Sequence, residues 1–252
     1  MLLSVQNISK HFGGLAALSG ISFGIEPGQI FGLIGPNGAG KTTLFNCLTG
    51  VYKPSAGHFT FEDVDITGFS EPTVAQQGIA RTFQNIRLFK EMTVLENVMV
   101  GRHCRTNAKL WGALTRSKKT RSEEREIHKQ AAALLDFVGL SDQQDRLSKH
   151  LPYGHQRRLE IARALATGPK LLCLDEPAAG MNPQEVGGLM ALIRKISESA
   201  VTVLLIEHHM KVVMGICDRI AVLDGGGLIA AGTPGEVQSD PWVIAAYLGR
   251  SR

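Results

Sequence analysis

One stretch of the sequence decides the fold: Gly35-Pro36-Asn37-Gly38-Ala39-Gly40-Lys41-Thr42. It matches the pattern G-x-x-x-x-G-K-[ST] at every position. The apolar run from Ile30 to Ile34 predicts a strand before it, and the residues from Lys41 to about Leu48 predict a helix after it. A strand, a glycine-rich loop and a helix in that order predict a phosphate-binding loop (P-loop).

The residue types in this loop suit a triphosphate. Glycines let the backbone wrap closely around phosphate oxygens while several N–H groups point inward. The N-terminus of the following helix adds partial positive charge, and Lys41 adds a full charge at the β- and γ-phosphates. The Thr42 hydroxyl can ligate Mg²⁺, and Thr43 continues the same turn. The sequence therefore predicts that residues 35–43 bind a nucleoside triphosphate.

Composition and charge exclude several kinds of protein. Of the 252 residues, 44% are apolar, which is ample for a buried core, and 20% are charged, which excludes bulk disorder. The formal charge of +4 is too small to indicate nucleic acid as a partner. No apolar run approaches the ~18 residues of a membrane span, and the first residues lack the pattern of a signal peptide. We therefore expect a cytosolic chain.

The four cysteines match neither a zinc site nor a disulfide framework, because their spacing along the chain is wide and irregular. Cys173 belongs to an apolar run and Cys47 to a helical pattern. We therefore expect both to be buried, reduced thiols.

Periodicity places further elements along the chain. Capping signals mark two helix starts and a glycine marks one helix end. The predicted strands are Leu3–Ile8, Ile21–Ile25, His58–Phe61, Leu171–Leu174 and Val201–Ile206, the last two being parallel strands covered on both faces. Three helices are predicted. One begins at the capping box Thr93–Glu96, and another begins at Asn182-Pro183. A third covers Glu123–Val138, with Gly139 in the left-handed position at its C-terminus.

A basic segment stands out between Gly101 and Lys129. It holds nine lysines and arginines against three glutamates, so its balance of +6 exceeds that of the whole chain. Two readings stay open: a solvated helical face, or a surface that meets anionic lipid headgroups or an acidic partner.

An acidic pair ends the strand at Leu171–Leu174. Asp175 and Glu176 follow it directly. An acid at a strand tip beside a P-loop can hold Mg²⁺, and a neighbouring one can act as general base on the attacking water. We assign the metal role to Asp175 and the base to Glu176.

The run from Leu151 to Ala164, LPYGHQRRLEIARA, resembles the signature motif of ABC-transporter ATPases, commonly written LSGGQ, with its helix. The resemblance implies that Leu151, Tyr153, Gly154 and His155 close over ATP held by the P-loop of a second subunit, so that a head-to-tail dimer sandwiches two nucleotides. A helix N-terminus offers N–H groups to a γ-phosphate, but one chain cannot supply two such termini to one phosphate.

Three positions depart from the motif. Pro152 replaces the serine, Tyr153 replaces the first glycine and His155 replaces the glutamine. Pro152 removes both a hydroxyl and an N–H that would meet the γ-phosphate. We therefore expect the composite site that uses this signature to hydrolyse ATP more slowly than its counterpart.

Other positions also resemble the ABC family. By that resemblance Gln84 is the Q-loop glutamine, which reaches Mg²⁺ and the water and senses the membrane subunit. His208 fits the switch histidine that contacts the γ-phosphate, although His209 adjoins it, and residues 178–182 occupy the D-loop, which bridges the dimer. Phe12 lies where an aromatic ring stacks on adenine.

Four segments narrow the resemblance to the larger ATPase subunit of branched-chain (hydrophobic) amino acid importers: 80–89, 92–97, 177–183 and 240–249. The resemblance implies ATP and Mg²⁺ as cofactors, a second ABC ATPase that is a paralogue or another copy, two membrane permeases and, indirectly, a substrate-binding protein. It implies a peripheral position on the cytoplasmic face of the inner membrane. Two alternatives remain: the ATPase of a lipopolysaccharide-export complex, or a soluble ABC ATPase outside transport.

The expected fold class is α/β, a single ABC ATPase domain of the P-loop type. We expect an antiparallel β lobe at about 1–30 and 51–70 and a mostly parallel core at about 30–87 and 161–235. A helical subdomain is expected at about 88–160 and a helical tail at 236–252.

Overall fold

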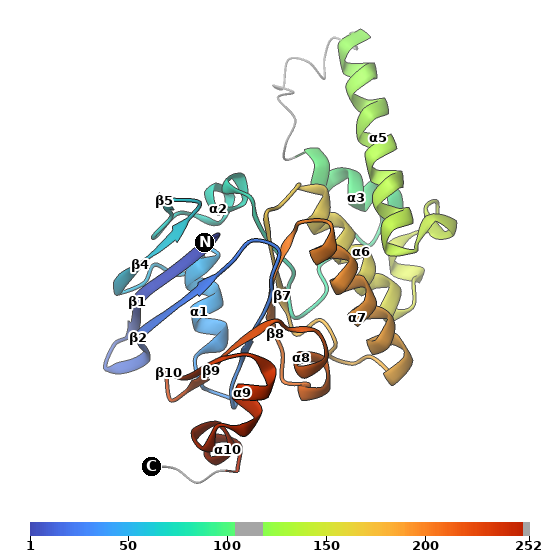
Figure 1. The fold of residues 1–252 in the computed structure, drawn as a ribbon. Coiled ribbons are helices and arrows are strands. Elements are labelled where there is room, and N and C mark those ends of the chain that lie inside the picture. Colours follow the sequence, from blue (N-terminus) through green and yellow to red (C-terminus); the bar gives the residue numbers. More distant parts are fainter. Residues whose placement is uncertain (104–117, 249–252) are drawn as a thin grey trace. The chain divides into compact units, whose positions relative to one another are not determined.

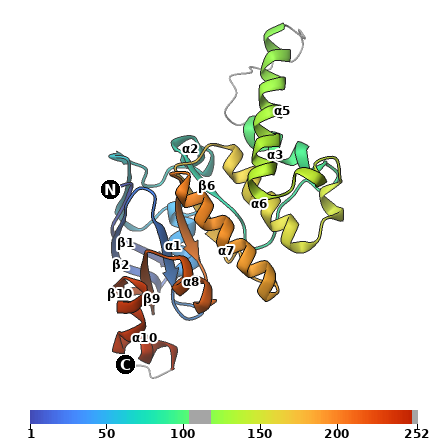
Figure 2. The same cartoon turned by 45° about the vertical axis from the view of Figure 1, so that its right-hand side comes forward.

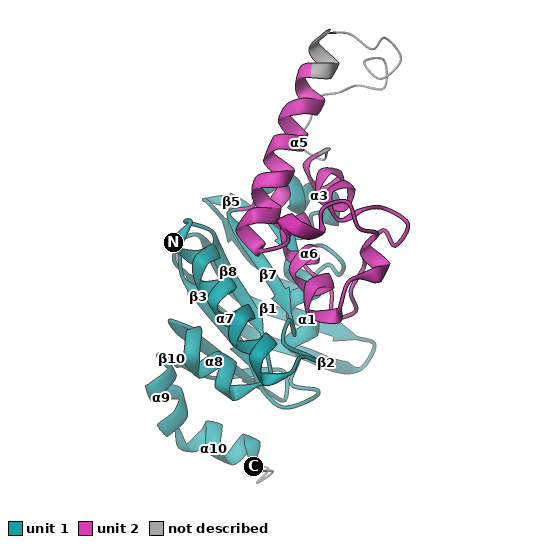
Figure 3. Cartoon of the chain, turned by 90° about the vertical axis from the view of Figure 1, so that its right-hand side faces the viewer, with its two compact units in different colours: residues 1–81, 170–252 teal, residues 82–169 magenta. Residues whose placement is uncertain are grey.

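The computed structural model describes residues 1–103 and 118–248 (Figure 1). The chain forms two compact units: unit 1 contains Met1–Arg81 and Lys170–Arg252, and unit 2 contains Thr82–Pro169 (Figure 3). Cys104 and much of the basic segment lie outside the described residues, so neither reading of that segment is tested. Among the described helices, none combines the length and the apolar character that crossing a membrane requires.

A six-stranded sheet forms the centre of unit 1, in the order β10-β9-β3-β8-β7-β6. Its neighbours pair in parallel except β9 and β10. Every residue of β3, β7 and β8 is buried, which confirms the prediction of parallel strands covered on both faces. The strands are β3 (Ile30–Ile34), β6 (Ile79–Arg81), β7 (Leu171–Asp175), β8 (Thr202–Ile206), β9 (Arg219–Asp224) and β10 (Gly227–Gly232).

A four-stranded antiparallel sheet, in the order β2-β1-β4-β5, forms the other layer of unit 1. Its strands are β1 (Leu3–Phe12), β2 (Leu15–Ile25), β4 (Ala56–Phe61) and β5 (Val64–Asp65). The α/β class, with a mostly parallel sheet and an antiparallel lobe, is therefore confirmed. Strand β1 continues to Phe12, beyond the predicted end at Ile8. The residues after Ile8 are half-buried or exposed, so the buried apolar pattern stops at Ile8 although Lys10, His11 and Phe12 still pair with β2.

Helix α1 (Lys41–Leu48) lies between the two sheets (Figures 1 and 2). Its Leu44 and Phe45 belong to one buried cluster with Phe59 of β4 and Leu204 of β8. Burying a large apolar side chain stabilises a fold by about 1.5–3 kcal/mol. The packing of α1 therefore fixes the position of its N-terminus, from which the P-loop is built.

The remaining helices of unit 1 follow the strands. Asn182 caps α7 by accepting hydrogen bonds from the N–H groups of Gln184 and Glu185, which confirms the predicted start. Leu189, Ile193 and other residues on one face of α7 are buried. The helices are α2 (Glu71–Gln77), α7 (Pro183–Glu198), α8 (Met210–Ile216), α9 (Pro234–Ser239) and α10 (Pro241–Tyr247).

Unit 2 is helical. It contains α3 (Val94–His103), α5 (Lys118–Val138) and α6 (Tyr153–Ala166), with short 3₁₀ turns at Ser141–Gln143 and Ser148–His150. Thr93 and Glu96 exchange the two hydrogen bonds of a capping box, and Gly139 has φ +73°, so both predicted helix signals are confirmed. A Cβ on Gly101 would lie 2.3 Å from the Arg163 carbonyl oxygen, so this glycine permits the close packing of α3 on α6.

The buried thiols give a direct test of this packing. Cys47, Cys173 and Cys217 are buried and free, which confirms the prediction for the first two. Burial raises the pKa of the Cys47 thiol to about 11 and those of Cys173 and Cys217 to about 12. Because the thiolate is the reactive form, these thiols are protonated and inert at about pH 8.

We predict that a Cys104→Ser variant reacts only slowly with Ellman's reagent in native buffer. The same variant should expose three reactive thiols at once in concentrated guanidinium. Absorbance of the released thiolate measures both rates. Rapid labelling of any thiol in the native protein would contradict the packing.

Candidate nucleotide-binding site

The P-loop joins β3 to α1 and depends on two glycines. Gly35 has φ +147°, and a Cβ there would lie 2.1 Å from the Leu223 carbonyl oxygen of β9. Gly40 has φ +101°, and a Cβ there would lie 2.8 Å from the Ala17 carbonyl oxygen of β2. A side chain at either position would collide with backbone, which explains why the loop pattern places glycine at both ends.

Lys41 supplies the cation of the loop. Its Nζ donates hydrogen bonds to the carbonyl oxygens of Gly35 (2.7 Å) and Pro36 (3.0 Å). Burial lowers the pKa of this ammonium, while the nearby carboxylates of Glu176 and Asp175 act in the opposite direction. The first two loop residues therefore hold the lysine in place.

A cleft of about 570 Å³ opens beside the loop. It is lined by residues 37–43 of the loop and α1, by Phe12, residues 15–17 and Glu176, and by the glycine turn Gly225-Gly226. All of these residues belong to unit 1. The ring of Phe12 is 43% exposed and lies edge-on to Tyr52 at 5.4 Å between ring centroids, so it borders the cleft and is not a core residue.

The acidic pair and the predicted switch histidine meet at one end of the parallel sheet. Asp175 ends β7 and is buried, and Glu176 follows with φ +44°, a left-handed conformation that costs a residue with a side chain free energy. The Glu176 N–H donates to the carbonyl oxygen of Ile206 at 2.9 Å. His208 Nδ1 lies 3.5 Å from Glu176 Oε1, although the two residues come from different strand ends. The structure therefore brings these two predicted residues together.

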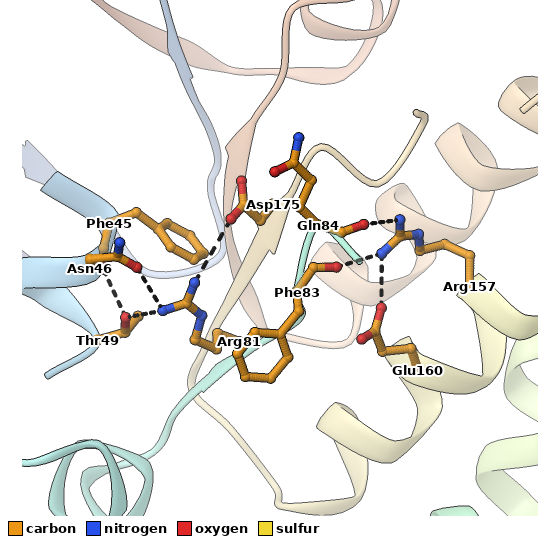
Figure 4. A network of polar contacts seen from close by, with 9 residues as sticks. All are labelled: Phe45, Asn46, Thr49, Arg81, Phe83, Gln84, Arg157, Glu160 and Asp175. Carbon is orange, nitrogen blue, oxygen red and sulfur yellow. Dashed lines mark hydrogen bonds and ion pairs between the residues drawn. The ribbon is translucent and has the colours of Figure 1, made fainter. Parts of the chain in front are cut away.

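Arg81 is a residue of this site that the motifs did not reveal. Its Nη2 lies 3.8 Å from Asp175 Oδ2, and its Nη1 donates to Asn46 Oδ1 (3.0 Å) and to Thr49 Oγ1 (2.8 Å) on and after α1 (Figure 4). The guanidinium also lies 4.7 Å from the centre of the Phe45 ring. A cation thus links the metal-binding candidate Asp175 to the helix of the P-loop.

Glu207 is a second missed residue. Its side chain is fully buried, and its Oε1 accepts from the N–H of Ala178 at 2.8 Å. Its Oε2 accepts from the N–H groups of His208 (3.1 Å) and His209 (3.2 Å). One carboxylate therefore fixes the backbone of the predicted D-loop and of the predicted switch histidine together.

The other predicted site residues lie in unit 2. Gln84 is the third residue of that unit, in the segment after β6. Leu151 is buried, and Pro152 is the N-cap of α6 with no side-chain hydrogen bond to the helix. Helix α6 begins at Tyr153, which is exposed, and continues through Gly154, which is buried, and the half-buried His155. A helix N-terminus whose N–H groups lack a side-chain cap suits an anion.

Comparison with known proteins identifies the family. The family model described as "ABC transporter" matches residues 18–179. The chain belongs to the ABC transporter family. A second model, "Branched-chain amino acid ATP-binding cassette transporter", matches residues 228–252. The resemblance seen in the sequence is therefore confirmed, and the chain is an ABC ATPase.

Relatives in this family align over almost the whole chain. It is 48% identical to the high-affinity branched-chain amino acid transport ATP-binding protein BraF of Pseudomonas aeruginosa, over 99% of this chain and 98% of that protein. It is 46% identical to LivG of Escherichia coli, with the same coverage. These identities place this ABC ATPase in the LivG/BraF type.

Solved ABC cassettes share the fold. A nucleotide-free ATP-binding cassette of an ABC transporter superposes with a TM-score of 0.85 at 36% identity, covering 98% of each chain. The ADP conformation of an ATP-binding cassette superposes with a TM-score of 0.86 at 36% identity and the same coverage.

We predict that Glu207→Gln lowers the free energy of unfolding by about 1–3 kcal/mol, because one amide N–H₂ group must then face a buried N–H donor. Urea denaturation followed by tryptophan fluorescence or circular dichroism measures the loss. Glu185→Gln is the matched control, since a glutamine preserves the half-exposed capping box of α7. Equal stability of the two variants would contradict the role of Glu207.

Proposed function

We propose that this ABC ATPase binds ATP in the cleft beside the P-loop and hydrolyses it to energise the import of branched-chain or other hydrophobic amino acids. The observation that carries the proposal is the meeting of Glu176 and His208 beside a cleft lined by the P-loop and Glu176, in a chain 48% identical to the BraF transport protein. Such a cleft can bind a triphosphate and polarise a water molecule.

The groups around the loop fit a magnesium triphosphate. Lys41 and the loop N–H groups neutralise phosphate charge. Thr42 and Asp175 offer a hydroxyl and a carboxylate, which are hard oxygen ligands that Mg²⁺ prefers. The family resemblance assigns the amide oxygen of Gln84 to the same ion. Bound there, the ion would compensate the charge that develops on the transferred phosphoryl group.

Glu176 is the proposed general base and His208 the proposed contact to the γ-phosphate. Their separation of 3.5 Å lets the imidazole hold the carboxylate in place while it polarises water. The hydrogen bonds of Glu207 to the backbone fix His208, and Arg81 fixes Asp175. Phe12, at the edge of the cleft, stacks on adenine in this proposal.

The signature residues act on a second ATPase in this proposal. Leu151, Tyr153, Gly154 and His155 close over ATP held by a P-loop of the partner, which is a paralogue or another copy. Two membrane permeases and, indirectly, a substrate-binding protein complete the transporter. The pair of ATPases would then lie on the cytoplasmic face of the membrane.

The predicted parts of the domain have separate roles in this proposal. The helical subdomain, predicted at about 88–160 within the compact unit Thr82–Pro169, is proposed to carry the signature. The antiparallel sheet is proposed to bind the base of the nucleotide through Phe12. The C-terminal helices α9 and α10 are proposed to form a tail outside the catalytic core.

We predict that Glu176→Gln abolishes ATP hydrolysis at the P-loop of this chain and leaves ATP bound there, because the amide cannot accept a proton from the attacking water. The purified transporter in proteoliposomes should take up radiolabelled leucine with ATP, and the variant should take up none. Glu198→Gln, at the exposed end of α7, is the matched control and should transport normally. Undiminished hydrolysis by Glu176→Gln would contradict the assignment of the base.

We also predict that Pro152→Ser raises the ATPase rate of the assembled complex, by up to about tenfold, because it restores a hydroxyl and an N–H beside the γ-phosphate of the partner site. Pro234→Ser, at the first turn of α9, is the matched control. An unchanged rate in Pro152→Ser would show that the proline does not limit this half-site.

A further inference from the structure

The Q-loop segment, residues 83–87, is fastened to α6 inside unit 2. The carbonyl oxygens of Phe83 and Gln84 accept hydrogen bonds from Arg157 Nη1 (2.7 Å) and Nη2 (2.8 Å) (Figure 4). The Arg87 N–H donates to Glu160 Oε1 at 3.2 Å. Three backbone atoms of the segment are thus held by two side chains one turn apart on the helix.

These two side chains form a buried ion pair. Arg157 Nη1 lies 2.8 Å from Glu160 Oε2, and the side chains are 0% and 1% exposed. Burial raises the pKa of Glu160, and Arg157 opposes that rise. A buried pair is weak evidence for stability, since its desolvation offsets much of the attraction. The planar guanidinium of Arg157 can instead hold the groups that it contacts in one fixed geometry.

The same guanidinium also reaches the start of the signature helix. Arg157 Nη2, which binds the Gln84 carbonyl oxygen, also donates to the Tyr153 hydroxyl at 3.2 Å. The guanidinium carbon lies 5.9 Å from the centre of the Tyr153 ring. One nitrogen therefore contacts both the proposed Q-loop glutamine and a proposed signature residue.

The contact of Arg157 with residues 83 and 84 lies directly after the point where the chain passes from one unit to the other. That point lies between Arg81 and Thr82. On the unit 1 side Arg81 is bound to Asn46, Thr49 and Asp175. A displacement of residues 83–87 must then either break the bonds to Arg157 or move the N-terminal turn of α6 with it.

We propose that Arg157, oriented by Glu160, is a positioning residue that couples the Q-loop segment to the signature end of α6, so that a movement imposed by the permease at Gln84 changes how Tyr153 meets the nucleotide of the partner. This inference rests on the proposed function, which assigns Gln84 and Tyr153 to those two contacts.

The test is Arg157→Lys in the transporter reconstituted into proteoliposomes. A lysine keeps the charge beside Glu160 but lacks the fork that binds two carbonyl oxygens and a hydroxyl together. We expect leucine uptake per ATP hydrolysed to fall about tenfold, because a small misplacement of a positioned group is amplified in function. Binding of ATP to the isolated chain should stay within about twofold of wild type, since Arg157 does not line the cleft.

Arg158→Lys is the matched control. Arg158 is the next residue of α6, and its Nη1 lies 3.5 Å from the Val138 carbonyl oxygen, away from the Q-loop segment. It should keep the wild-type ratio of uptake to hydrolysis. A wild-type ratio in Arg157→Lys would overturn the proposal. An equal loss of uptake, hydrolysis and ATP binding would also overturn it, because that result indicates a structural role alone.

Tyr153→Phe tests the same coupling if Arg157→Lys does not fold. The variant removes only the hydroxyl that accepts from Arg157 and should lower the ratio by about two- to threefold. Where Arg157→Lys does fold, the double variant should lose no more than Arg157→Lys alone, since residues that act through one contact are not additive. A wild-type ratio in Tyr153→Phe, or full additivity, would overturn the link to the signature. A wild-type complex that transports nothing would instead refute the proposed function.

Discussion

A triphosphate carries several negative charges, and the structure meets them with backbone N–H groups and one buried lysine. To present these groups, residues 35–41 must pack closely against the backbone of neighbouring strands. Gly35 approaches the Leu223 carbonyl oxygen of β9, and Gly40 approaches the Ala17 carbonyl oxygen of β2. Because those two oxygens belong to different sheets, the loop can form only when both sheets of unit 1 are in their folded positions. The cleft, the lysine and the position of α1 all depend on that constraint.

The catalytic candidates are held in place by the hydrogen-bonded charges of two side chains, Glu207, which is fully buried, and Arg81, which is partly buried. Glu207 accepts three backbone N–H groups, and Arg81 joins Asp175 to α1. Both side chains supply hydrogen-bond partners that are already in position. The polar groups of the site therefore need not reorient during the reaction, as they would in water. The left-handed backbone of Glu176 is the strain that remains, and it occurs at the residue proposed to act on water.

Local signals predicted much of this molecule. The P-loop, the capping boxes at Thr93 and Asn182 and the buried strands β7 and β8 were readable, because each depends on residues close together in sequence. Arg81, Arg157 and Glu207 were not readable. Their partners are backbone or side-chain atoms that the fold brings near, such as the Phe83 carbonyl oxygen 74 residues from Arg157. A buried charge that binds distant backbone leaves no periodic pattern.

The central claim is that ATP is hydrolysed only between the P-loop of one ATPase and the signature of another. The most direct measurement is the ATPase rate per chain, recorded together with the molecular mass in solution over a range of protein concentrations, with and without the partner ATPase. The account predicts that the rate per chain rises with association and reaches a plateau when association is complete. A lone monomer that turns over ATP at the full rate would contradict it.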